Sequence, residues 1–125
     1  MTENEIATII VNASLEVHKE LGPGLLESIY ESCLGYELKQ RGLNVTQQHP
    51  LSVFYKGEQM DIAFRLDLWV EKKVVVEVKA VEMLTDIPMA QILTYLKLTD
   101  SKLGLLINFN VPLIKNGIRG VVNNL

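Results

Sequence analysis

The segment from residue 61 to residue 79, DIAFRLDLWVEKKVVVEVK, constrains the fold of this chain more than any other stretch. It contains two strand-like apolar runs, which the charged residues Asp67, Glu77 and Lys79 interrupt. A charged side chain among valines loses hydration, and that loss is costly unless a metal ion or a partner group compensates for it. Three such residues close together therefore predict a functional site.

The connection between the two runs decides whether the two carboxylates share a face of the sheet, because directly opposed residues of an antiparallel pair do so. A two-residue turn would put Asp67 and Glu77 on opposite faces. A three-residue connection, which pairs Val70 with Val74, puts both on the same face. The Glu-Lys pair after Val70 is poorly suited to a two-residue turn, which requires positive φ. We therefore predict an odd-length connection or a bulge, with Lys79 on the same face as the carboxylates.

The remaining elements follow from the spacing of apolar residues. We expect strict alternation in the strand over residues 60–70, with even-numbered residues from Ile62 to Val70 on one face and odd-numbered residues from Asp61 to Trp69 on the other. The segment 117–125 fits either a helical turn or an edge strand. The predicted helices cover residues 2–21, 25–41 and 87–99, and the predicted strands cover residues 51–55, 60–70, 74–80 and 103–108.

The resulting order α-α-β-β-β-α-β predicts an α/β fold of the mixed α+β kind. Three antiparallel strands are continued by a fourth, which arrives through a helical crossover that should cover the sheet. We therefore expect a central four-stranded mixed sheet flanked by helices. A length of 125 residues, 48% of them hydrophobic, suits one domain over residues 1–125.

Composition excludes several classes of protein. The single cysteine, Cys33, excludes an internal disulfide and a Cys-rich zinc site. No apolar run approaches the roughly 20 residues of a membrane span, and the N-terminus is acidic where a signal peptide would be basic. We therefore expect a cytoplasmic location without membrane contact. A net charge of −3 gives no general attraction to nucleic acid, so such binding must depend on a local basic patch, a metal or a partner.

The residues of the central segment suit one kind of chemistry. Two neighbouring carboxylates repel each other, and Mg²⁺ relieves that repulsion while keeping several waters and room for phosphate oxygens. A bound Mg²⁺ acidifies a water, and a lysine at the same place holds that water or neutralises the transition state. Asp67, Glu77 and Lys79 therefore suit phosphodiester hydrolysis. From spacing alone, a salt-bridge ladder on a solvated sheet face remains the alternative, since Glu-x-Lys is frequent by chance.

Two helices supply further candidates. Glu27 lies at the edge of the apolar face of the second helix, and its position alone favours a first-turn glutamate that interacts with the helix dipole. Gln91 and Tyr95 are four residues apart and lie along one edge of the apolar band of the third helix. The pattern alone does not assign these residues to a site.

The order of elements resembles the core of the PD-(D/E)XK nuclease superfamily, with Asp67 on one strand of the hairpin and Glu77-x-Lys79 on the next, followed by a crossover helix and a strand. Gly24-x-x-Glu27-x-x-Tyr30 is similar to the signature of the GxxExxY family, which is generally placed within that superfamily. The blocks RLDLWVE, VVVEVKAVE, AQILTYL and GLLINFNVP also resemble that family, so the resemblance spans residues 6–122. Leu66 stands where the superfamily pattern has proline.

This resemblance implies a restriction-endonuclease-like core and a nuclease that uses Mg²⁺ or Mn²⁺ to hydrolyse phosphodiester bonds in DNA or RNA. Asp67 and Glu77 would bind the metal together with the Val78 carbonyl. Lys79 would be the catalytic lysine. Glu27 would reach the metal directly or through water.

The resemblance also implies supporting residues. Gln91 and Tyr95 match a Gln-x-x-x-Tyr element that positions substrate and site in one exonuclease-like branch. Tyr30 would support the site by packing, with its hydroxyl bonded near Glu27. Arg65, on the face of Asp67, could contact phosphate or form an ion pair with an acid, and we favour the ion pair.

Two further expectations concern partners. A non-catalytic module that binds nucleic acid or protein through the same fold is the alternative to a nuclease, because the chain is small, acidic and without a dedicated DNA-binding element. A homodimer is compatible with both functions, since closed two-fold symmetry is the commonest oligomeric form. Trp69 and residues 111–114 are candidates for its interface and equally for the core.

Overall fold

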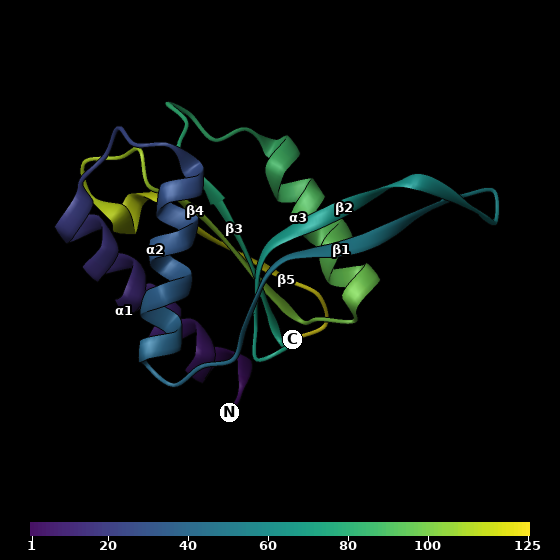
Figure 1. Cartoon of the computed structure of the whole chain (residues 1–125), viewed down its shortest axis with the longest axis horizontal. Helices are drawn as coiled ribbons and strands as arrows, with labels where there is room; N and C mark the ends of the chain where they lie inside the picture. Colours follow the sequence, from purple (N-terminus) through teal and green to yellow (C-terminus); the bar gives the residue numbers. More distant parts are fainter.

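The computed structural model describes the whole chain, residues 1–125, and contains a mixed sheet with helices on both faces (Figure 1). The helices are α1 (Glu3–Leu21), α2 (Glu27–Gln40), α3 (Asp86–Thr99) and the 3₁₀ helix η1 (Ile114–Gly117). The strands are β1 (Val45–Tyr55), β2 (Glu58–Val70), β3 (Val74–Lys79), β4 (Leu103–Asn108) and β5 (Ile118–Val122). None of these helices combines the length and the apolar character needed to cross a lipid bilayer.

The strands follow one another in the order β1-β2-β3-β4-β5, with β3 and β4 parallel and every other neighbouring pair antiparallel. The mixed α/β fold and the α3 crossover predicted from sequence are confirmed. The sheet has five strands and not four, because the segment 117–125 takes the edge-strand alternative, with β5 pairing with β4 from Leu103↔Val122 to Ile107↔Ile118. The short edge segment Ile-Arg-Gly-Val-Val contains a glycine and does not alternate, so its sequence carries little strand signal.

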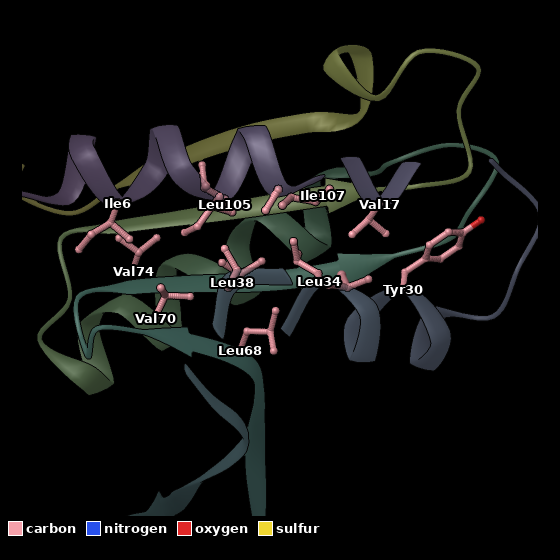
Figure 2. Close-up of a cluster of buried hydrophobic side chains, with 14 of the residues drawn as sticks. Ile6, Val17, Tyr30, Leu34, Leu38, Leu68, Val70, Val74, Leu105 and Ile107 are labelled. Atoms are coloured by element: carbon pink, nitrogen blue, oxygen red, sulfur yellow. The ribbon is translucent and has the colours of Figure 1, made fainter. Parts of the chain in front are cut away.

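Two hydrophobic clusters hold the layers together. The larger cluster packs α1 and α2 against one face of the sheet, as Figure 2 shows, and the smaller one packs α3 against the other face. A capping box starts α1, in which the Thr2 side chain accepts from Glu5 N and the Glu5 carboxylate accepts from Thr2 N. The larger cluster includes Ile6, Ile10, Val17, Tyr30, Leu34, Leu38, Leu68, Val70, Val74, Leu105 and Ile107.

The connection between β2 and β3 has the predicted odd length. Val70 pairs with Val74, which leaves residues 71–73 as the connection, with the first two at φ 54° and 52°. Continuing this register from Leu68↔Val76 sets the next two residues, Asp67 and Glu77, opposite each other. The same-face arrangement of the two carboxylates therefore follows from the turn.

The strict alternation expected along β2 is wrong at one point. Leu66 packs in the cluster on the α3 side, whereas Leu68 packs in the cluster beneath α1 and α2. Opposite this reversal, Gln48 of β1 has a φ of 53°, in the left-handed region. Both strands change direction here and continue as a long hairpin that projects from the rest of the molecule (Figure 1). We call its outer part, residues 52–63, the arm.

Gly104 in β4 allows α3 to approach the sheet. A Cβ atom at this position would lie 2.9 Å from Ile92 Cδ1 and 3.0 Å from Ile92 Cγ1, and Ile92 is fully buried. We expect Gly104→Ala to lower the free energy of unfolding by about 1–3 kcal/mol, because the added methyl group overpacks this contact. Urea denaturation would measure the change, and an equally stable variant would contradict the close approach.

Candidate active site

The carboxylates of Asp67 and Glu77 lie where β2 and β3 separate. Beyond Leu68↔Val76, each side chain bonds to the backbone of the opposite strand: Asp67 N donates to Glu77 Oε2 at 2.8 Å, and Val78 N donates to Asp67 Oδ2 at 2.8 Å. The two carboxylates thus accept the N–H groups that would otherwise pair with backbone carbonyls of the neighbouring strand. The strands fix the position of both carboxylates, which share one site as the register predicted.

The pKa values of these carboxyl groups reflect their environment. Burial, followed by the negative charge of Asp67, raises the pKa of Glu77 to about 8. Burial also raises the pKa of Asp67, although the hydrogen bond from Val78 N and the charge of Lys79 act in the opposite direction. Ionising both carboxyl groups is therefore costly in the metal-free protein, and a bound cation would lower that cost.

Lys79 and Glu27 lie beside this pair. Lys79 is half-buried and forms no salt bridge, while its charge lowers the pKa of both Asp67 and Glu77. Glu27, the first residue of α2, accepts a hydrogen bond from Ala80 N through its Oε2 at 3.3 Å. The structure therefore brings Glu27 to the end of β3 beside Lys79, as the family resemblance implied, whereas its position in the sequence alone favoured a role at the helix dipole.

The loop before α2 explains the spacing of Gly24, Glu27 and Tyr30. Gly24 has a φ of 98°, which favours glycine, and it precedes the start of α2 at Glu27. Tyr30 is fully buried, and its hydroxyl donates to Gly22 O at 2.5 Å and accepts from Leu25 N at 3.1 Å. Its ring stacks on Phe109 with centroids 4.6 Å apart. Tyr30 thus ties the loop to the core and orients the helix that carries Glu27.

We expect Tyr30→Phe to lower the free energy of unfolding by about 1–2 kcal/mol, because the change removes both hydrogen bonds while retaining the stacked ring. Thermal unfolding followed by circular dichroism measures this change. Tyr36→Phe on the exposed face of α2 is the matched control and should have no effect. If Tyr30→Phe were as stable as the wild type, the hydroxyl would not hold the loop.

Glu31 and Gln48 belong to the same acidic cluster, and sequence reasoning missed both. Gln48 Nε2 donates to Glu31 Oε1 at 2.8 Å, to Glu31 Oε2 at 3.0 Å and to Asp67 Oδ1 at 3.4 Å. Burial and then the charge of Asp67 raise the pKa of Glu31 against this hydrogen bond. Glu31 follows Glu27 by one helical turn, a spacing that could have revealed it. Nothing in the sequence signals the left-handed backbone that directs Gln48 into the cluster.

Of the remaining predicted site residues, the structure buries Tyr95 and leaves Gln91 and Arg65 exposed. Tyr95 is buried against Phe64, and burial followed by the charges of Glu77 and Asp67 raises its pKa, so its hydroxyl lies within electrostatic reach of the site. Gln91, one turn earlier, is exposed and its side chain makes no hydrogen bond within the chain. Arg65 is also exposed, and its Nη1 donates to the Gln48 carbonyl at 3.5 Å.

The ion pair that sequence reasoning favoured for Arg65 is wrong, because the chain's single salt bridge joins Arg41 to Glu37. The side chain lies on the exposed hairpin, where solvent compensates its charge without an acidic partner. The guanidinium of Arg65 is therefore free to contact a ligand.

Asn108 stabilises the backbone that follows Lys79. This buried side chain donates from Nδ2 to Val81 O at 2.8 Å and accepts at Oδ1 from Val81 N at 3.0 Å and from Asn110 N at 3.2 Å. Phe109 N also donates to Lys79 O at 2.9 Å. A polar residue at the end of an otherwise apolar strand was a signal that sequence reasoning did not use.

The donor set can be compared with the needs of a metal ion. No three His, Cys, Asp or Glu side chains are arranged so that they alone could hold a metal. Mg²⁺ commonly takes only one or two protein carboxylates and completes its shell with water. Asp67 and Glu77 supply two hard oxygen ligands, and a cation beside them would favour the ionised form of both groups, whose pKa values burial raises. The residues present therefore fit Mg²⁺ or Mn²⁺ by their chemistry.

The site is partly buried, because Glu77 is 7% exposed and Asp67 and Lys79 are half-buried. None of the four cavities in the structure is lined by Asp67, Glu77 or Lys79, and the one of about 470 Å³ lies at Met1 and the β2–β3 connection.

Comparison with known protein families gives one match, which covers residues 4–121 and has the description PD-(D/E)XK nuclease superfamily. Comparisons with curated proteins and with solved structures yield no match. The family match covers nearly the whole chain, and the mixed sheet flanked by three helices is consistent with the restriction-endonuclease-like fold of that superfamily. The chain belongs to the PD-(D/E)XK nuclease superfamily.

Proposed function

We propose that this protein is a metal-dependent nuclease of the GxxExxY type, which hydrolyses phosphodiester bonds in DNA or RNA with Mg²⁺ or Mn²⁺. The observation that carries the proposal is the reciprocal hydrogen bonding of Asp67 and Glu77, which places two carboxylates at the separation of β2 and β3 with Lys79 beside them. Membership of a nuclease superfamily supports the same reaction class.

In the proposed mechanism, a bound Mg²⁺ or Mn²⁺ would supply an acidified water and charge stabilisation at the phosphate. Asp67 and Glu77 would hold that ion with the Val78 carbonyl, and Glu27 would contribute directly or through water. Lys79 would orient the attacking water or neutralise charge that develops on the phosphate. Because Lys79 has no salt-bridge partner within the chain, its ammonium group is available for this role.

Side chains around the carboxylates support nucleic acid as the proposed substrate. Arg65 is exposed and unpaired near Gln48, so it can contact a phosphate of the substrate. Tyr95 and Gln91 lie on α3, whereas Arg65 lies on β2, and the two α3 residues would help to position the substrate. The net charge of −3 opposes general binding to nucleic acid, so affinity should depend strongly on the metal ion.

A panel of labelled substrates tests the proposal: single-stranded DNA, duplex DNA, RNA and a branched junction, each with Mn²⁺, Mg²⁺ or EDTA. We expect cleavage of at least one substrate, dependent on metal. Lys79→Met, which keeps the length of the side chain and removes its charge, should abolish cleavage. Cleavage that persists in EDTA or in Lys79→Met would contradict the proposed site.

A second candidate function is a non-catalytic module that binds nucleic acid or protein. Two observations favour it: the net charge is −3, and no three His, Cys, Asp or Glu side chains are arranged to hold a metal ion by themselves. This candidate predicts that neither Mn²⁺ nor Mg²⁺ raises the melting temperature. A metal-dependent rise that Glu77→Gln abolishes would exclude it, because a ligand at 100 times its Kd adds about 2.7 kcal/mol.

A further inference from the structure

Gln48 of β1 lies opposite Asp67 in the sheet, inward of the arm, where the hairpin changes direction. The pairing of β1 with β2 on both sides of this position sets the two residues opposite each other. On the other side of β2, the register with β3 sets Glu77 opposite the same aspartate. Gln48, Asp67 and Glu77 thus lie in one row across β1, β2 and β3.

The backbone of Gln48 adopts a conformation that is unfavourable for glutamine. Its φ of 53° lies in the left-handed region, which residues other than glycine rarely occupy within a strand. Glycine adopts this conformation without strain, so the bend of the hairpin does not itself require glutamine. Gln48 is also exposed and adds little to the core. Its side chain therefore has a role other than shaping the strand or filling the interior.

The amide of Gln48 joins two carboxylates from different elements. Its Nε2 donates to both oxygens of Glu31 on α2, at 2.8 and 3.0 Å, and to Asp67 Oδ1 on β2 at 3.4 Å. Two carboxylates that share one donor lie close enough to repel each other, and the amide hydrogens between them reduce that repulsion. Glu31 thus orients the amide, and the amide in turn orients Asp67.

Both oxygens of the Asp67 carboxylate therefore have a hydrogen-bond donor. Oδ2 accepts from Val78 N at 2.8 Å, and Oδ1 accepts from the amide of Gln48. A single contact would leave the carboxylate free to rotate about it. The second contact, from a different strand, fixes the rotation as well as the position of the group.

We propose that Gln48 is a positioning residue of the active site, which holds the Asp67 carboxylate in the orientation that receives the metal ion. This inference rests on the proposed metal-dependent function. Groups that hydrogen-bond to metal ligands orient them, and the loss of such a group typically lowers metal affinity or activity by about 10–100-fold. When the ligand is already oriented, less ordering is needed as the ion binds.

A positioning role predicts a particular dependence of cleavage on metal concentration. Because Gln48 acts through Asp67 and not on the substrate, a saturating concentration of metal compensates for its loss. In Gln48→Met we expect the Mn²⁺ concentration at half-maximal rate to rise at least about tenfold, with the saturated rate within about threefold of the wild type. A group that contacts the substrate would instead lower the saturated rate.

Calorimetric titration of the full chain with Mn²⁺ measures the same effect without catalysis. Gln48→Met keeps the length of the side chain and removes its donor, whereas Gln48→Gly removes the side chain and adopts the left-handed backbone without strain. We expect both variants to bind Mn²⁺ at least about tenfold more weakly than the wild type. In urea denaturation with EDTA, Gln48→Gly should be about as stable as the wild type, because relief of strain offsets the lost hydrogen bonds.

The matched control is Gln47→Met, the same substitution at the exposed neighbouring glutamine of β1. The side chain of Gln47 lies against Gly35 of α2 and makes no hydrogen bond to the carboxylates of the site. This variant should bind Mn²⁺ and cleave substrate as the wild type does. Circular dichroism checks that each variant retains the wild-type fold.

The outcomes separate the role of Gln48 from the metal site itself. Weaker Mn²⁺ binding in both Gln48 variants, with wild-type affinity in Gln47→Met, would support the positioning role. A wild type that binds Mn²⁺ no better than either Gln48 variant would overturn this role and leave the metal site standing. A wild type that binds no Mn²⁺ would overturn the metal site, and the role of Gln48 with it.

Two further results would also overturn the positioning role. A saturated rate at least about tenfold below that of the wild type in both Gln48 variants would mean that this residue contacts the substrate. A Gln48→Gly variant that loses stability but keeps its Mn²⁺ affinity would mean that the residue acts on the fold alone.

Discussion

Replacing Asp67 by asparagine is expected to lower the rate of metal-dependent cleavage by at least about 10³-fold, because it removes one of two charged metal ligands. The amide oxygen of asparagine can still accept the hydrogen bond from Val78 N, which Asp67 Oδ2 accepts at 2.8 Å. Burial raises the pKa of Asp67, so removing its charge also relieves an electrostatic cost in the metal-free protein. The variant should therefore be at least as stable as the wild type in EDTA.

Single-turnover rates with Mn²⁺ measure this effect, and melting temperatures in EDTA check the fold. Asp61→Asn is the matched control, since Asp61 is an exposed aspartate on the same strand. It should cleave at the wild-type rate. A variant of Asp67 that retains a tenth or more of the wild-type rate would show that this carboxylate does not hold the catalytic metal.

The metal-free protein is expected to lose stability as the pH rises from about 4.5 to about 8. Glu77 has a pKa of about 8 in the folded chain, against an ordinary value of 4.5. The folded state therefore binds this proton more tightly than the unfolded state, and the free energy of unfolding falls across that window. The two values correspond to a loss of at most about 5 kcal/mol. Asp67 and Glu31 act in the same direction, since their pKa values are raised too.

Urea denaturation in EDTA at pH 5, 6.5 and 8 measures this dependence. Glu77→Gln should remove most of the pH dependence of the free energy of unfolding. Glutamine keeps an oxygen that accepts from the Asp67 N–H group, and it has no proton to release. Glu82→Gln, on the exposed loop after β3, should leave it unchanged. With saturating Mn²⁺ the free energy of unfolding should instead rise with pH, because the metal binds ionised carboxylates. A wild type equally stable at pH 5 and pH 8 would contradict the burial of Glu77.

Local chemistry in the sequence was sufficient for the centre of the site. The connection of odd length predicted after Val70 sets Asp67 opposite Glu77, although Glu71 and Lys72 both adopt the positive φ that this pair was expected to disfavour. The third helix and the wholly apolar fourth strand were equally clear, because β4 is buried over its whole length. Each of these features depends on residues that are close together in the chain.

The features that were missed depend on contacts between distant segments. Gln48 joins α2 to β2 through a left-handed backbone, a conformation that glutamine rarely adopts and that no residue pattern announces. Glu31 of α2 joins the site through Gln48 of β1 and the nearby charge of Asp67 on β2. The reversal of alternation between Leu66 and Leu68 and the pairing of β5 with β4 likewise involve segments that are distant in the chain.

The central claim is that Asp67 and Glu77 form a divalent cation site, and calorimetric titration of the protein with Mn²⁺ tests it most directly. The experiment compares the wild type with Glu77→Gln, which removes one ligand charge while retaining a hydrogen-bond acceptor for the Asp67 N–H group. We predict saturable binding near one ion per chain for the wild type, weakened at least about tenfold in Glu77→Gln. Absence of binding to the wild type, or equal binding to both proteins, would contradict the claim.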